Sequence, residues 1–257
     1  MESSIHPDAS LGEGVEIGKF SIVEYEVSIG DGCTIGHHVV IHAGSRIGAR
    51  VRIDDHAVIG KHPMAAKRSK ITKGGRTFEP VTIGDDSIIG TGAIIYTGST
   101  IGKGVLVADT ASVREDTIIG DFTIIGRNAT IDNKVSIGAR CKIQTDVYIC
   151  AYSEIGDDCF IAPCVATSND NYAGRWAERT KYYRGVTVKS GGRIAVNSTI
   201  LPGRVIGPDG MAAAGSVVTR DVPEGVIVSG NPARILRPVP ENQLLKNQED
   251  SIESPSS

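Results

Sequence analysis

The chain has 257 residues, of which 40% are hydrophobic and only 5% aromatic, while glycine contributes 31 residues. This composition disfavours a core of large rings and favours many tight turns, and a formal charge of −3 gives no reason to expect nucleic acid or a membrane surface as a partner. The N-terminus shows no secretory pattern and no apolar stretch approaches the roughly 18 residues that span a bilayer, so we expect a cytoplasmic protein.

An aliphatic residue recurs every six positions over three blocks, 5–59, 83–161 and 188–218. A period of six is a multiple of two but not of 3.6, so it fits short strands and not helices. The residue two positions earlier points to the same face and is small, and glycine often follows the aliphatic residue, where we expect it to permit a corner. The pattern therefore predicts an all-β fold, a three-sided parallel β-helix of about ten coils.

The five cysteines include no CxxC pair, which disfavours a disulfide framework and a thiolate metal site. Cys33, Cys141 and Cys159 all occupy the small inward position. We expect them to be buried, reduced thiols.

The first interruption of the repeat spans residues 61–82 and carries basic residues with no acidic residue before Glu79. These include Lys67 and Arg68. One interpretation is an electrostatic clamp for phosphates, and the other is a solvated loop whose charges have no partner.

The second interruption spans residues 167–187 and holds the single tryptophan and three of the seven tyrosines. Asn169 and Asp170 lie where the chain leaves the prism, a rigid position that suits catalytic polar groups. The alternatives are that the two residues cap the loop's own backbone and that the rings only anchor the loop. We expect the two loops to lie about 20 Å apart along the prism axis.

The repeats are followed by Gly215-Ser216-Val217-Val218-Thr219-Arg220-Asp221-Val222-Pro223 and by Gly230-Asn231-Pro232-Ala233-Arg234. This combination resembles the hexapeptide-repeat acyltransferases, which implies a left-handed prism over residues 1–237, a polar and frayed tail over 238–257, and a homotrimer with active sites between prisms. In that family the ending lies along coenzyme A. The resemblance places the coenzyme at Ala213, Gly215, Arg220, Asn231 and Arg234, although ordinary surface arginines remain an alternative for the last of these and for Arg220.

Three segments, residues 89–96, 107–115 and 167–172, are similar to the N-acetyltransferases of dTDP-3-amino-3,6-dideoxyhexoses. That resemblance implies acetyl transfer from acetyl-CoA to a nucleotide-sugar amine, for bacterial surface glycans, without a metal. It implies that Asp170 accepts a hydrogen bond from the amine and that Asn169 positions the sugar. The expected substrate-binding residues are Arg114, Glu115, Tyr172, Lys67 and Arg68.

All six histidines lie at or before position 62, so none is near the second loop. This departs from the many acyltransferases of this fold that use a histidine base, including the lipid A acyltransferases, and resembles the 3-aminosugar enzymes. A zinc site of the γ-class carbonic anhydrase type is disfavoured, because His37 and His42 have a suitable offset but only His6 lies upstream as a third ligand. A UDP- or dTDP-4-amino sugar, a longer acyl donor and a non-catalytic scaffold remain alternatives.

Overall fold

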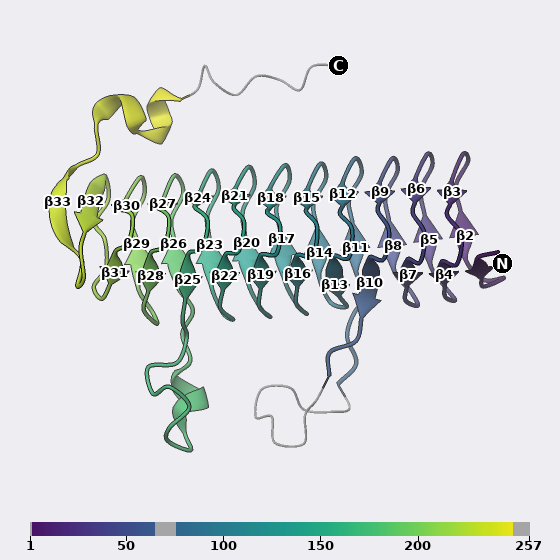
Figure 1. Cartoon of the computed structure of the whole chain (residues 1–257), viewed down its shortest axis with the longest axis horizontal. Helices are drawn as coiled ribbons and strands as arrows, with labels where there is room; N and C mark the ends of the chain where they lie inside the picture. The colour runs from purple at the N-terminus through teal and green to yellow at the C-terminus, as the bar shows by residue number, and fades with distance from the viewer. Residues whose placement is uncertain (1, 65–75, 249–257) are drawn as a thin grey trace.

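The computed structural model describes residues 2–64 and 76–248, and over these ranges the chain forms one long prism of stacked coils with two loops on one side (Figure 1). Its strands are almost all two residues long and form three sheets. Within the described ranges there is no helix long and apolar enough to cross a membrane.

Sheet A has eleven strands, in the order β1 (Ser4–Ile5), β4 (Ile22–Val23), β7 (Val40–Ile41), β10 (Val58–Lys61), β13 (Ile94–Tyr96), β16 (Ser112–Val113), β19 (Thr130–Ile131), β22 (Tyr148–Ile149), β25 (Ala166–Thr167), β28 (Thr199–Ile200) and β31 (Val217–Val218). Sheet B has ten, β2 (Ser10–Leu11), β5 (Ser28–Ile29), β8 (Arg46–Ile47), β11 (Thr82–Ile83), β14 (Thr100–Ile101), β17 (Ile118–Ile119), β20 (Ser136–Ile137), β23 (Glu154–Ile155), β26 (Thr187–Val188) and β29 (Val205–Ile206). Sheet C has twelve, β3 (Glu16–Ile17), β6 (Thr34–Ile35), β9 (Arg52–Ile53), β12 (Ile88–Ile89), β15 (Leu106–Val107), β18 (Ile124–Ile125), β21 (Lys142–Ile143), β24 (Phe160–Ile161), β27 (Arg193–Ile194), β30 (Met211–Ala212), β32 (Val226–Ser229) and β33 (Arg234–Pro238).

Each strand pairs in parallel with the strand one coil away, as in Ile22↔Val40 and Val23↔Ile41. The two partners are 18 residues apart, so three hexads make one coil, and the predicted parallel β-helix is confirmed. Sheets of ten to twelve strands make the stack one or two coils longer than the predicted ten. The left-handed winding stays a prediction.

The core is the narrow interior of the prism, filled by the residues that the repeat places inward. Ile41, Ile59 and Ile131 are fully buried, as are the small partners Cys33 and Val39. The predicted alternation of large and small inward residues is thus confirmed. All five cysteines are free thiols, and Cys164 is the exposed one.

The role predicted for the recurring glycine is wrong in one respect. A Cβ on Gly18 would lie 2.5 Å from the carbonyl carbon of Gly36, and one on Gly120 would lie 2.5 Å from that of Gly138. The glycine is therefore required by the close approach of the next coil. The left-handed backbone of the corner falls two residues later, where some coils use glycine, as at Gly32, and others a non-glycine residue, as at Phe20 with φ 63°.

The C-terminal end closes the prism differently from the rest. Strand β33 pairs antiparallel with β32, and two 3-10 turns, η2 (Glu241–Gln243) and η3 (Leu245–Asn247), follow it. The backbone N–H of Leu245 donates to Asp209 at 2.9 Å, so residues 241–248 are held against the prism. For these residues the structure differs from the expected frayed tail.

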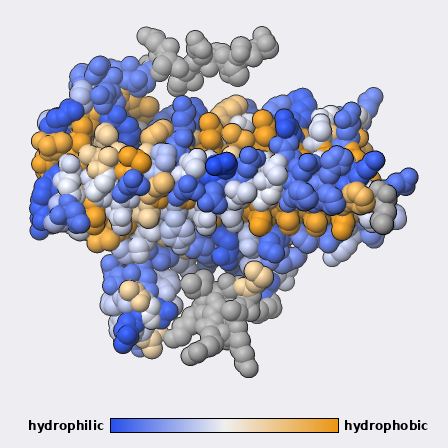
Figure 2. All heavy atoms as spheres, in the orientation of Figure 1, coloured by the Kyte–Doolittle hydropathy of each residue, from blue (hydrophilic) through white to orange (hydrophobic). Residues whose placement is uncertain are grey.

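The outer surface of the prism is mixed in character. Ile22, Ile88 and Phe160 are exposed at outward strand positions. On the face that Figure 2 presents, apolar side chains form interrupted rows along the prism, whereas the second loop below it is mostly polar.

Candidate functional site

Both loops leave the prism at one corner, formed by the turns that follow the strands of sheet A, which we call the loop corner. β10 leads into the first loop and β25 into the second, and both loops project from the same side (Figure 1). The two strands are five pairings apart in sheet A, or about 24 Å at ~4.8 Å per strand. The prediction that the two loops lie about 20 Å apart along the prism axis is thus close to the spacing in the structure, which is slightly greater.

The loop corner differs from the other corners in the residue that follows the inward aliphatic residue. After sheet B this residue is Gly12, Gly30, Gly48, Gly84, Gly102, Gly120, Gly138, Gly156, Lys189 or Gly207. After sheet A the described positions from the second coil to the second loop are Glu24, His42, Gly60, Tyr96, Arg114, Asp132, Cys150 and Ser168. One corner is therefore closed tightly by glycine, while another carries side chains with chemical function.

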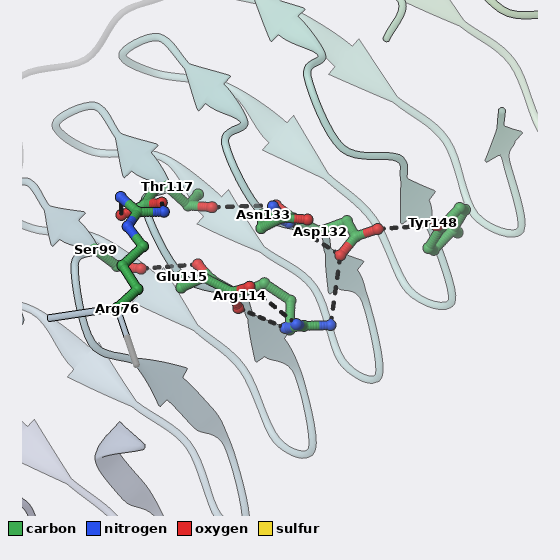
Figure 3. Close-up of polar contacts among 9 residues, drawn as sticks. Arg76, Ser99, Arg114, Glu115, Thr117, Asp132, Asn133 and Tyr148 are labelled. Carbon is green, nitrogen blue, oxygen red and sulfur yellow. Dashed lines mark hydrogen bonds and ion pairs between the residues drawn. The ribbon is translucent and has the colours of Figure 1, made fainter. Parts of the chain in front are cut away.

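Arg114 and Glu115 form an ion pair at the loop corner (Figure 3). The guanidinium Nε and Nη2 donate to the two carboxylate oxygens at 2.8 and 3.0 Å, and Glu115 is only 3% exposed. The Arg114 guanidinium also lies 5.0 Å from the centre of the Tyr96 ring. Burial acts to lower the pKa of Arg114, but the hydrogen bonds to Glu115 and the charges of Glu115 and Asp132 raise it overall. The Arg114 guanidinium therefore stays charged and is held by two hydrogen bonds to Glu115.

Asp132 and Tyr148 extend this network by one coil (Figure 3). Asp132 Oδ1 lies 3.6 Å from Arg114 Nη1, and the Tyr148 hydroxyl donates to Asp132 Oδ2 at 3.2 Å. Burial, and next the charge of Asp132, raise the pKa of Tyr148, so its hydroxyl stays protonated and can donate. Sequence reasoning missed both residues. The sequence signal that could have revealed them is the 18-residue period. It places both residues on the side of sheet A, no more than two coils before the second loop.

The end of the first loop docks on the same corner. Arg76 Nη1 lies 2.7 Å from Asp116 Oδ2, and its guanidinium lies 4.5 Å from the centre of the Phe78 ring. Lys67 and Arg68, the predicted clamp residues, lie outside the described residues.

Asp170 is tied into the second loop. Its Oδ1 accepts the backbone N–H of Tyr172 at 2.8 Å, and its Oδ2 accepts that of Gly174 at 2.9 Å and Arg179 Nε at 3.2 Å. Burial acts to raise the pKa of Asp170, but these hydrogen bonds and the Arg179 charge lower it overall. The carboxylate caps the loop backbone, as the structural alternative predicts, and it is ionised at neutral pH.

Asn169 closes the base of the second loop. Its carbonyl oxygen accepts the backbone N–H of Arg184 at 3.2 Å, and its side-chain Nδ2 donates to Ala151 O at 3.4 Å. The loop then carries a cluster of three exposed rings, in which Trp176 lies 5.0 Å from Tyr172 and 5.2 Å from Tyr182 between ring centres.

The predicted coenzyme residues lie in three places. Arg220 and Arg234 line one pocket of about 300 Å³ with Val228 and Ile235. Ala213 and Gly215 follow β30 at the corner between sheets C and A. Asn231 belongs to the turn between β32 and β33.

His37 and His42, the two histidines considered for a zinc site, do not come together. His37 follows β6 of sheet C and His42 follows β7 of sheet A, so they lie at different corners. Across the described ranges, no group of three or more His, Cys, Asp or Glu is placed to hold a metal ion.

The repeats of this chain match known families. Residues 8–43 match the bacterial transferase hexapeptide model (six repeats), and residues 80–108 and 116–151 match the hexapeptide repeat of succinyl-transferase. Over these three segments the chain therefore resembles the hexapeptide repeats of bacterial transferases.

Among curated proteins, the chain is similar to the dTDP-3-amino-3,6-dideoxy-alpha-D-galactopyranose 3-N-acetyltransferase of Aneurinibacillus thermoaerophilus, with 54% identity over 48 residues, 19% of this chain and 25% of that protein. It is also similar to the galactoside O-acetyltransferase of Escherichia coli, with 33% identity over 88 residues, 33% of this chain and 43% of that protein. The matches span from a quarter to under half of these relatives.

Among solved structures, the chain is similar to the UDP-N-acetylglucosamine acyltransferases of Arabidopsis and Bacteroides fragilis. The TM-scores are 0.57 and 0.52, with 19% and 21% identity. The similarity covers 98% and 99% of this chain and 76% and 79% of those chains. At this identity the likeness is one of fold.

Proposed function

We propose that the chain transfers an acetyl group from acetyl-CoA to the 3-amino group of a dTDP-linked 3-amino-3,6-dideoxyhexose, in the cytoplasm, for bacterial surface glycans. The observation that carries this proposal is the 54% identity over 48 residues with an acetyltransferase named for such a sugar. The lack of any histidine after position 62 supports the same choice over a histidine-dependent relative.

The reaction forms a bond between the sugar nitrogen and the acetyl carbon and breaks the carbon–sulfur bond of the thioester. The amine must be neutral to attack, and a backbone N–H near the second loop would stabilise the oxyanion of the tetrahedral intermediate. The proton that leaves the nitrogen ends on the coenzyme sulfur, so the products are the amide and free CoA.

In this proposal Asp170 orients the amine. An ionised carboxylate has about four lone-pair sites, and the loop occupies three of them. The remaining site would accept one N–H of the amine and align it with the thioester. Because its pKa is lowered, Asp170 is a poor final base, which is why the proton is assigned to sulfur.

The other predicted residues take supporting roles. Asn169 and Tyr172 would hold the sugar at the second loop. Arg114 and Glu115 would contact the substrate on the side that faces the first loop. Arg220 and Arg234 share a pocket, which suits coenzyme phosphates. A homotrimer would place these groups between neighbouring prisms.

The test is release of CoA, followed by thiol titration, with acetyl-CoA and a panel of amino sugars. We expect dTDP-3-amino-3,6-dideoxyglucose to react faster than the dTDP-4-amino isomer and UDP-linked amino sugars, and acetyl-CoA to react faster than longer acyl donors. Preference for another sugar or donor would replace the substrate assignment. No release with any pair, from a folded protein that does not bind CoA, would favour the scaffold alternative.

A further inference from the structure

A pocket lies beneath the C-terminal segment 241–248, far along the prism from the first loop. It has a volume of about 230 Å³ and is lined by Asp158, Gly191, Arg193, Asp209 and residues of η2 and η3. A water molecule occupies about 30 Å³ in the liquid, so the pocket has room for a group larger than a single water.

Arg193 contributes an unusual feature to this pocket. Its Nη1 donates to Gln243 Oε1 at 3.1 Å, but its Nε and Nη2 are buried and, among the described residues, have no hydrogen-bond partner. The side chain stands on β27 between Phe160 and Met211, which offer no strong acceptor. Burying unpaired donors of a charged group costs free energy, so a hydrogen-bond acceptor at this edge of the guanidinium would stabilise the fold.

The same edge binds a carboxylate at several other arginines of this chain. Nε and Nη2 together bind the two oxygens of a carboxylate in four arginines, Arg50, Arg52, Arg114 and Arg140. This side-on fork matches the geometry of carboxylates and phosphates. At Arg193 the fork is formed, buried and empty of any described side chain.

The two acidic residues of the pocket do not accept hydrogen bonds from Nε or Nη2 of Arg193. Asp158 is held by Arg140, with both contacts at 2.7 Å. Asp209 Oδ1 accepts the N–H of Leu245, and its charge acts on Lys246. Each acid therefore has a partner of its own, and among the described residues no anion faces the Nε and Nη2 edge of Arg193.

We propose that this pocket binds the carboxylate or phosphate group of a small ligand, with the Nε and Nη2 edge of Arg193 as its anchor. The site does not depend on the proposed acetyl transfer and lies outside the loop corner. The bound anion would link β27 to the C-terminal segment through Arg193 and Gln243, so its binding would stabilise that segment.

The test uses the full chain, with inorganic phosphate and acetate titrated separately against chloride at constant ionic strength. The Nε–H signal of Arg193 is followed by NMR and thermal unfolding is followed in parallel. We expect a saturable shift of that signal and a rise in Tm with at least one anion. Arg193→Gln should weaken the effect at least about tenfold, whereas Arg52→Gln, which removes a similar but exposed fork, should leave it unchanged.

Two further experiments, an Arg193→Lys variant and a competition with CoA, complete the test. Arg193→Lys keeps the charge but loses the fork, so it should also weaken binding if Arg193→Gln does not fold. Saturating CoA separates the sources, because loss of the phosphate response would identify a coenzyme phosphate as the occupant and an unchanged response would identify a separate ligand. Absence of any saturable shift in the unmodified chain, or equal binding by Arg193→Lys, would overturn the proposal.

Discussion

The Asp170 carboxylate caps the second loop and is the group proposed to orient the amine. Two backbone N–H groups and Arg179 hold it, which lowers its pKa and fixes its orientation at the base of the second loop. A group held by its surroundings loses little freedom when a substrate arrives, which favours an orienting role. The capping of the loop and the proposed contact to the amine are therefore compatible.

Asp170→Asn should lower kcat/KM by about tenfold to a hundredfold, because the uncharged amide makes a weaker hydrogen bond to the amine. Initial rates of CoA release measure this effect. Asp146→Asn, which alters an exposed aspartate at the corner between sheets C and A, is the matched control and should keep full activity. Equal rates for the Asp170 variant and the unmodified chain would remove Asp170 from the mechanism.

Inward residues could be predicted from the sequence because the six-residue period alone assigns them. Asp132 and Tyr148 could not, because their contacts join residues 16 to 18 positions apart on the outside of the prism. Those contacts depend on which corner each hexad faces. An 18-residue comparison of the position after the aliphatic residue reveals this, since glycine dominates after sheet B and is rare after sheet A.

Among the elements, the strands and the turns have different structural roles. Two-residue strands supply the ladder from coil to coil, and the glycine after nearly every sheet B strand allows the next backbone to approach. The second loop is held mainly by Asp170 and by its three packed rings. Its internal contacts could not be predicted from the sequence, since the loop follows no repeat.

Gly120→Ala should destabilise the prism by about 1–3 kcal/mol, because its Cβ would overlap the backbone at Gly138. Gly14→Ala is the comparison, since nothing lies within 4 Å of its Cβ and only its positive φ is strained. Chemical denaturation of both variants measures the difference. A smaller loss for Gly120→Ala than for Gly14→Ala would contradict the account of the corner.

The second loop should loosen in acid. Because the folded pKa of Asp170 is lowered, its contribution to stability is complete above the ordinary aspartate pKa of about 4 and is lost as the pH falls through the lower folded value. Fluorescence of Trp176, the single tryptophan, should therefore change below about pH 4. In Asp170→Asn this transition should be missing, and its persistence there would assign it to another group.

At the scale of the whole molecule, the prism is a long support that sets two loops at fixed spacing along one corner (Figure 1). The architecture could be predicted almost completely, because one short period repeats along most of the chain. In the proposed homotrimer the active site would lie between neighbouring prisms, and the sequence pattern of one chain does not specify such contacts.

Sedimentation equilibrium should give a mass of about three times 27.1 kDa, with or without CoA, if the chain forms the proposed homotrimer. In this proposal the prisms associate without substrate. A monomer that nevertheless transfers acetyl groups would contradict a site shared between prisms.

The most direct test of the central claim is the structure of the product. The full chain is incubated with acetyl-CoA and dTDP-3-amino-3,6-dideoxyglucose, and the sugar is analysed by NMR and mass spectrometry alongside thiol titration. The account predicts an amide at the 3-nitrogen, formed in equal amount to free CoA. An ester on a sugar hydroxyl, or CoA released without any acetylated sugar, would contradict it.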